Sequence, residues 1–312
     1  MERRLKRALP AKLGLIAAMA AIFIAISIAR PSFLTVGNLL NLLRQISING
    51  ILAVGVTYVL LTGGVDLSLG SVVALAGVVA AGFAHPAAYP VIVPVAIGIA
   101  TGAVCGGVNG WVVTRGRVAP FIATLGMMTA ARGLALVVSA GKPVSNLSRG
   151  FNFIGSGDIA GIPLPVSILV LVALVSHLFL KDFKLGRHIY AVGGSENAAR
   201  ASGLNVGAVK MFAYTFCGAM AGLAGVVLAG RITTGQPNAG VGYELDAIAA
   251  VVIGGTSLNG GVGGVGGTVL GAFLMGVINN GLDLLNVSSY YQQIVKGVII
   301  AGAVWLDRNK DK

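Results

Sequence analysis

The run VIVPVAIGIATGAVCGGVNGWVV, residues 91–113, decides the fold class because its 23 residues include no charged side chain. An α-helix needs about 20 mainly apolar residues to cross the hydrocarbon core of a bilayer. Within lipid the backbone must satisfy its own hydrogen bonds, and a helix does so within one segment. The run therefore predicts a transmembrane helix.

Nine further runs of this kind follow from the rest of the chain, and the composition agrees with them. Mean hydropathy is +0.89, 10% of the 312 residues are charged and 47 are glycine. Soluble domains carry about 25% charged residues, and two cysteines are too few for a disulfide scaffold. We predict an all-α integral membrane protein with about ten transmembrane helices, at residues 13–29, 46–62, 68–84, 91–113, 121–140, 164–180, 209–229, 244–259, 263–283 and 291–306.

Lysine and arginine predict the orientation, because they concentrate in cytoplasmic segments. With the N-terminus inside, the inward segments hold fifteen of the 22 basic residues and the outward segments hold five. We therefore expect a multi-pass protein of the bacterial inner membrane with both termini in the cytoplasm. Residues 1–29 also resemble a secretory signal, but the length of their apolar run favours an uncleaved anchor. The net charge of +12 lies in short clusters between apolar runs, which indicates a lipid bilayer and no nucleic acid as partner.

Two parts of the chain resemble each other. GVDLS at residues 64–68 and GYELD at residues 242–246 both place glycine and an acid before an apolar helix. Runs 91–113 and 263–283 are both rich in glycine and end near asparagine. On the predicted topology, spans two to five and seven to ten would be five spans apart and hence antiparallel, which fits an inverted repeat, a plan common in transport proteins. The alternative is chance similarity between glycine-rich helices.

Glycines recur with helical spacing in both runs. This spacing places them on one face of each helix, where two backbones can approach closely. Packing explains these stripes without any further function. They are Gly98, Gly102, Gly106 and Gly110 in the first run and Gly263, Gly267 and Gly271 in the second.

Sequence motifs of catalysis are missing. The chain has no His-Glu-x-x-His helix, no Gly-x-Ser-x-Gly elbow and no Walker A loop, and its three histidines are scattered. Residues 261–266 match Gly-x-Gly-x-x-Gly, but the strand that a dinucleotide site requires does not precede them. We expect no metal, no cofactor and no enzymatic activity of the chain itself. If ATP drives its action, another polypeptide must hydrolyse the nucleotide.

Ionisable residues inside predicted spans are candidates for function, because a charge in the bilayer is expensive. Asp66, Glu244 and Asp246 lie where helices begin, so they are intramembrane acids that could cap free N–H groups. The alternative is ion coupling or contact with a solute. Lys296 and Asp283 could pair across helices.

The inward loop 181–208 contains a short segment with helix-capping residues at both ends. Ser195 suits an N-cap, Glu196 the first turn, Arg200 a partner four residues on, and Gly203 a left-handed stop. A helix of about two turns is not stable alone in water. It must lie on the membrane or dock into a partner, for which its small alanines are suited.

At these positions the sequence resembles a known family, the permease subunits of ribose-type ABC importers. The similar motifs extend over nearly the whole chain: GVDLSLGS (64–71), FIATLG (121–126), GRHIYAVGG (186–194), AARASG (198–203), GYELDAIAAVVIGGTSL (242–258) and VSSYYQ (287–292). The resemblance implies one transmembrane permease domain over residues 1–312, of the vitamin-B12-permease type (type II importer). It also implies a homodimer, a cytoplasmic ABC ATPase subunit and a periplasmic sugar-binding protein, with ribose as the expected sugar.

The resemblance further implies that the inward loop docks into the ATPase. The expected coupling residues are Gly193, Ser195, Glu196, Asn197, Ala198, Ala199, Arg200 and Gly203. Because a sugar is neutral and rich in hydroxyl groups, amide side chains in or near spans are candidates for its path, with packing as the alternative: Asn49, Asn109, Asn279 and Asn280. An ion-coupled secondary sugar carrier and an intramembrane enzyme are the rival functions.

Overall fold

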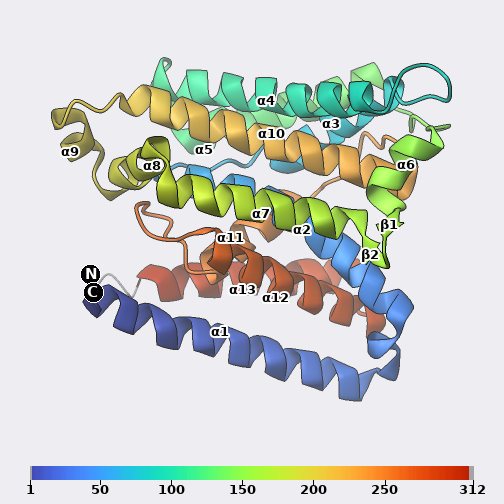
Figure 1. The fold of residues 1–312 in the computed structure, drawn as a ribbon, viewed down its shortest axis with the longest axis horizontal. Coiled ribbons are helices and arrows are strands. Elements are labelled where there is room, and N and C mark those ends of the chain that lie inside the picture. The colour runs from blue at the N-terminus through green and yellow to red at the C-terminus, as the bar shows by residue number, and fades with distance from the viewer. Residues whose placement is uncertain (1, 309–312) are drawn as a thin grey trace.

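The computed structural model describes residues 2–308, with side chains for residues 14–302 and Trp305. Within that part, every element longer than two residues is a helix. The long helices run side by side along one direction (Figure 1). In chain order the helices are α1 (Glu2–Ala29), the 3-10 turn η1 (Pro31–Leu34), α2 (Val36–Leu61), α3 (Leu69–Gly82), α4 (Ile92–Thr114), α5 (Pro120–Val138), α6 (Arg149–Ser156), α7 (Leu164–Asp182), α8 (Lys184–Gly194), α9 (Glu196–Ala201), α10 (Val206–Ile232), α11 (Tyr243–Ile253), α12 (Val265–Leu284) and α13 (Ser289–Arg308).

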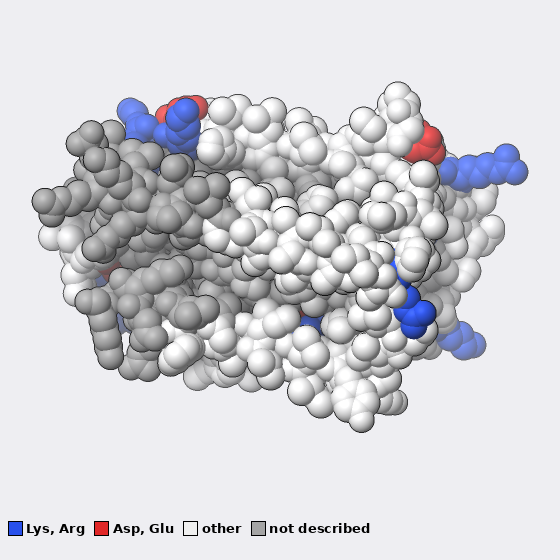
Figure 2. Space-filling view, turned by 90° about the horizontal axis from the view of Figure 1, so that it is seen from below, with Lys and Arg blue, Asp and Glu red and all other residues white. Residues whose placement is uncertain are grey.

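Each of the ten predicted runs overlaps one helix, which confirms the all-α class. Six helices are long and apolar enough to cross a membrane: α2, α4, α5, α7, α10 and α12. The apolar part of α1, Gly14–Ala29, and α3 are shorter. On the face drawn in Figure 2, the charged side chains gather mainly at the two ends and the broad zone between them is almost free of charge. These features agree with a membrane protein.

Two predicted boundaries are wrong. Helix α2 begins at Val36, ten residues before the predicted start, so Arg44 lies within a helix and donates to the Ser156 carbonyl oxygen over 3.4 Å. Hydropathy cannot locate this start, because the preceding Pro31 turn sets it. Helix α11 ends at Ile253 and not near 259, because Gly254 follows and Gly255 takes φ +91°.

The two long loops contain secondary structure that hydropathy does not predict. Loop 141–163 holds α6 and a hairpin of β1 (Asp158–Ile159) and β2 (Ile162–Pro163), paired Asp158↔Pro163 and Ile159↔Ile162. Loop 181–208 holds α8 and α9. Figure 1 places these loops at opposite ends of the bundle, with the start of α1 and the end of α13 at the α8–α9 end. An even number of membrane crossings would place the start of α1 and the end of α13 at the same end of the bundle in this way.

The first glycine stripe packs as the spacing predicts. At Gly102 a Cβ atom would overlap the Gly218 carbonyl oxygen and the Gly222 backbone of α10, and at Gly106 it would overlap the Tyr214 carbonyl oxygen. Helices α4 and α10 are therefore in backbone contact, which only glycine permits. In the second stripe Gly267 and Gly271 contact α11 in the same way. Gly263 lies in the loop before α12, at φ +138°, so placing it on the helix was wrong.

Two short helices, α3 and α11, each follow a non-helical connection from the long helix before them. Residues 62–68 connect α2 to α3, and residues 233–242 connect α10 to α11. The two starts meet, because a Cβ atom at Gly70 would overlap the Gly240 carbonyl oxygen and the Glu244 carboxylate. These two connections place polar groups inside an otherwise apolar bundle.

Candidate functional site

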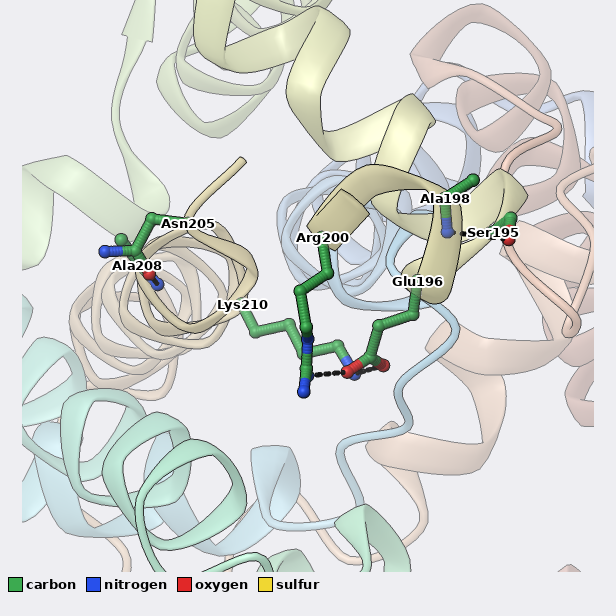
Figure 3. Close-up of polar contacts among 7 residues, drawn as sticks. All are labelled: Ser195, Glu196, Ala198, Arg200, Asn205, Ala208 and Lys210. Atoms are coloured by element: carbon green, nitrogen blue, oxygen red, sulfur yellow. Dashed lines mark hydrogen bonds and ion pairs between the residues drawn. The ribbon is translucent and has the colours of Figure 1, made fainter. Parts of the chain in front are cut away.

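Helix α9 has the caps that the sequence predicts. The Ser195 side chain accepts a hydrogen bond from the Ala198 N–H at 3.3 Å, and Gly203 takes φ +81° after the last turn. A second N-cap follows at once, where Asn205 Oδ1 accepts from the Ala208 N–H at 3.0 Å and begins α10. Figure 3 shows the two caps on either side of the connection. The segment is thus fixed by local bonds on both sides.

Glu196 joins α9 to the transmembrane bundle. Its carboxylate accepts from Arg200 at 2.9 Å on its own helix and from Lys210 at 2.6 Å on α10, as Figure 3 shows. The hydrogen bond from Lys210 is the main cause that lowers the pKa of Glu196 below its usual value. Arg200 was predicted as the partner, whereas Lys210 was missed. Its spacing of fourteen residues crosses a helix junction, so periodicity could not reveal it.

The predicted coupling residues do not all face outward. Ala198 and Asn197 are exposed, whereas Ala199 is 5% exposed and packs into the protein's own core. A bulky residue at Ala199 would disturb this chain before it met a partner, so the expectation that both alanines dock is wrong for Ala199. Gly193 also faces inward, because a Cβ atom there would overlap the Leu61 carbonyl oxygen and the Gly261 N–H.

The end of α8 ties the segment to a second part of the bundle. The Tyr190 hydroxyl donates to the Gly263 carbonyl oxygen at 3.0 Å, and Gly193 lies against the end of α2. Helices α8 and α9 therefore form a protrusion with two attachments, one to the loop before α12 and one to α10. A displacement of its exposed side would therefore be transmitted to both of these parts of the bundle.

The first intramembrane polar cluster surrounds Asp66. This carboxylate is 1% exposed and accepts from the Ser68 N–H at 2.9 Å and the Ser68 hydroxyl at 2.6 Å. Asn109 of α4 donates to Ser68 Oγ at 3.0 Å and to Asp66 at 3.5 Å. Asp66 thus stabilises the turn before α3. It does not cap the helix itself, because the N–H that it accepts from belongs to the N-cap residue Ser68.

The second cluster surrounds Asp246, which lies in the first turn of α11 as predicted. Asp246 is 3% exposed and accepts from Lys296 of α13 at 2.8 Å and from Asn279 of α12 at 3.2 Å. The suggested pair of Lys296 with Asp283 is wrong, since Asp283 accepts from Gln292 at 2.8 Å instead. Asp246 therefore forms an ion pair between helices and is not a simple cap.

The remaining candidates differ in what they contact. Glu244 accepts from the N–H of the N-cap residue Gly242 at 3.3 Å, so, like Asp66, it stabilises the turn before its helix. Asn280 exchanges two hydrogen bonds with Asn38, both at 3.0 Å, and so links α12 to α2. Asn49 is 5% exposed, and its side-chain oxygen has no partner in the structure. Asn109, Asn279 and Asn280 thus donate within the protein through their amide nitrogens, whereas the side-chain oxygens of Asn49 and Asn279 both lack a partner in the structure.

Comparison with known proteins identifies the family. Residues 38–304 match the family described as "Branched-chain amino acid transport system / permease component". The ribose import permease RbsC of Bacillus subtilis is 48% identical over 301 residues, 96% of this chain and 93% of the relative. RbsC of Escherichia coli K12 is 48% identical over 94% of this chain and 92% of its own.

A second kind of sugar permease matches over a similar length. The L-arabinose permease AraH of Escherichia coli K12 is 38% identical over 96% of this chain and 91% of the relative. No solved structure matches the chain. The family match covers most of the described helices, from α2 into α13. The chain therefore belongs to this family of transport-system permease components.

Proposed function

We propose that this protein is the membrane subunit of an ATP-driven importer that carries a monosaccharide, ribose, across the bacterial inner membrane. The observation that carries the proposal is the 48% identity with two ribose import permeases over more than nine tenths of the chain. A third, from Haemophilus influenzae, is 45% identical. The arabinose and allose permeases are both 38% identical, so ribose is preferred among the sugars.

The family description names branched-chain amino acids, and the intramembrane charges bear on that alternative. An amino acid would bring an ammonium and a carboxylate into the path, each needing a counter-charge in the bilayer. The carboxylate of Asp246 already has a counter-charge in this chain, because Lys296 binds it at 2.8 Å, although its Oδ1 atom has no hydrogen-bond partner. Asn49, with its unpaired acceptor, suits a neutral hydroxyl instead. These features support a sugar.

The partners follow from the same family. We propose a homodimer that binds a cytoplasmic ATPase through α8 and α9 and a periplasmic sugar-binding protein at the opposite end. Both termini would be cytoplasmic, which agrees with the fifteen-to-five division of basic residues. Exposed Ala198 offers the close-approach surface for the ATPase, and Glu196 would carry its movement into α10.

We also propose a vitamin-B12-permease-like architecture of ten crossings in which α2–α5 and α10–α13 are an inverted repeat. Each set has a long helix, a non-helical connection, a short helix, a glycine-rich helix and a last helix, with Asp66 in the first connection and Glu244 and Asp246 in the first turn of the second short helix. Asn109 donates to Ser68, and Asn279 donates to Asp246, the fifth residue of each related motif. Equivalent bonds at equivalent positions support common symmetry over chance likeness.

The test is reconstitution in proteoliposomes with the cognate ATPase, ATP and binding protein. We expect uptake of labelled ribose that unlabelled ribose suppresses and that arabinose, allose or leucine suppresses less. Proteoliposomes without the ATPase, given proton or sodium gradients, are the control. Uptake driven by a gradient in that control would establish a secondary carrier and overturn the proposal.

A further inference from the structure

The segment 233–242, which consists mainly of turns, penetrates the bundle at the end opposite to α9. It begins after α10, where a Cβ atom at Gly235 would lie 2.6 Å from Ala81 near the end of α3. It ends beside the start of α3, where Gly240 contacts Gly70. Gly235 also lies against Gly77 and Val78, so seven to eleven residues of α3 separate the two contacts, a length of about 10–16 Å at 1.5 Å per residue. The segment therefore runs inward along α3 and does not merely cover the bundle.

Arg132 of α5 holds this segment by its backbone. Its guanidinium donates to the Pro237 carbonyl oxygen at 2.6 Å and to the Ala239 carbonyl oxygen at 2.8 Å. An arginine inside a membrane bundle is costly unless its donors are used. Here the guanidinium donates to two carbonyl groups that lie outside any helix.

A second fastening lies near the outer end of the segment. Gly235 and Val144 exchange two backbone hydrogen bonds, both at 2.9 Å, so the segment is bridged to the loop before α6. The space left between the segment, α3 and α10 measures about 10 Å³, which is room for about one water molecule and none for a sugar. The segment thus closes the bundle at this place.

The closed arrangement also contains features that allow it to open. Left-handed residues flank the segment, with Thr233 at φ +59° and Gly242 at φ +83°, and such positions can serve as hinges. The buried Thr234 hydroxyl, which borders the small cavity, has no hydrogen-bond partner. Opening would give this hydroxyl water or a sugar as partner, whereas it would break the two bonds of Arg132. The two effects oppose each other.

We propose that residues 233–242 form the outer gate of the sugar path and that Arg132 is the positioning residue that latches this gate shut. The inference rests on the proposed function for what passes the gate, but the latch itself is a property of the fold. Arg132 acts through the backbone of the segment and need not touch the sugar. Breaking its two bonds should shift the segment toward an open state.

Thiol accessibility tests the latch without any need for transport. Ala74 lines the cavity beneath the segment and is 1% exposed, so Ala74→Cys reports opening. In sealed cells, a membrane-impermeant maleimide should modify this cysteine at least about tenfold faster when Arg132→Met is added. Arg132→Lys keeps a donor for one carbonyl and should give an intermediate rate. Arg149→Gln, at the exposed first residue of α6, changes an arginine elsewhere at the same end and should leave the rate unchanged.

Two internal controls separate a latch from general loss of structure. Native Cys105 and Cys217 are buried and should stay unmodified in every variant. An unchanged Ala74→Cys rate in Arg132→Met, or equal acceleration at the native cysteines, would overturn the latch. In the full transporter, Arg132→Met should also raise ATP turnover without binding protein. Failure of ribose uptake by the parent protein would reject the proposed function alone, because the labelling result stands apart from it.

Discussion

The two proposed halves of the bundle, α2–α5 and α10–α13, differ in how they stabilise a buried acidic side chain. In the first half, Asn109 donates to the uncharged Ser68, and Asp66 is satisfied by hydrogen bonds alone. In the second half, Asn279 donates to the carboxylate of Asp246, which Lys296 neutralises at 2.8 Å. The two halves share the position of the asparagine hydrogen bond, whereas the ion pair belongs to the second half.

The halves also differ in how their helices contact each other. Helix α10 of the second half packs on α4 in direct backbone contact at Gly102 and Gly106, with side chains of α10 against Gly98 and Gly110 on either side of that contact. Its counterpart, α2 on α12, has side chains in the interface, such as Ile46 against Gly276 and Thr57 bound to Thr268 at 2.7 Å. Side chains can change rotamer, whereas touching backbones cannot. We infer that movement during transport occurs more readily at α2–α12 than at α4–α10.

The largest expected effect on stability is at the ion pair between Asp246 and Lys296. Lys296→Met leaves the buried Asp246 carboxylate without its counter-charge, which should lower the free energy of unfolding by about 3 kcal/mol. Adding Asp246→Asn removes that charge and should recover most of the loss. Thermal unfolding of the purified variants measures both effects. A double variant no more stable than Lys296→Met would show that the ion pair is not the distinguishing feature of this half.

The glycine interfaces give the next largest effect. Gly102→Ala forces α4 and α10 apart, because its new Cβ atom meets backbone, and should destabilise by about 2 kcal/mol. Gly276→Ala meets the Ile46 side chain, which can rotate, and should cost less. Gly107→Ala, with only Thr215 Oγ1 at 3.6 Å, is the matched control. Equal loss of melting temperature at Gly102 and Gly276 would remove the contrast between the interfaces.

The equivalent asparagines should respond alike and more weakly. Asn109→Leu removes two buried hydrogen bonds, one of them long at 3.5 Å, and Asn279→Leu removes one, so each should destabilise by about 1 kcal/mol. Because the amide nitrogens of both residues donate within the protein, uptake should keep its KM for ribose. A raised KM in either variant, at normal stability, would place that asparagine in the sugar path and weaken the symmetry.

The smallest effect is expected at the exposed Glu196. Glu196→Gln should change stability by only about 0.5 kcal/mol, because solvent screens the pair. The lowered pKa means that the folded state favours the ionised carboxylate, so its contribution is present above the ordinary pKa of 4.5 and is lost as pH falls below it. The parent should lose this increment in acid, whereas Glu196→Gln should show no such pH dependence. Identical pH profiles would disprove the tie between α9 and α10.

Local sequence patterns predict much of this molecule, and contacts between distant segments limit the rest. Capping at Ser195 and Gly203 is a local property, so sequence reveals it. The Glu196–Lys210 and Asp246–Lys296 pairs join different helices, and only packing determines which charges meet. Arg132 stands out as an intramembrane cation, but its partners are carbonyl groups, which every residue possesses. No residue pattern can mark such a partner.

The most direct test of the proposed coupling uses exposed Ala198 in the reconstituted transporter. Ala198→Trp adds bulk on the outer side of α9, whereas Ala88→Trp adds the same bulk at an exposed position in the loop between α3 and α4. The measurement is ribose uptake together with sugar-stimulated ATP turnover, with ATPase and binding protein present. We predict that both rates fall together by at least about tenfold in Ala198→Trp and stay normal in Ala88→Trp. Normal uptake by Ala198→Trp with the ATPase still bound would contradict the role of α9 as the coupling element.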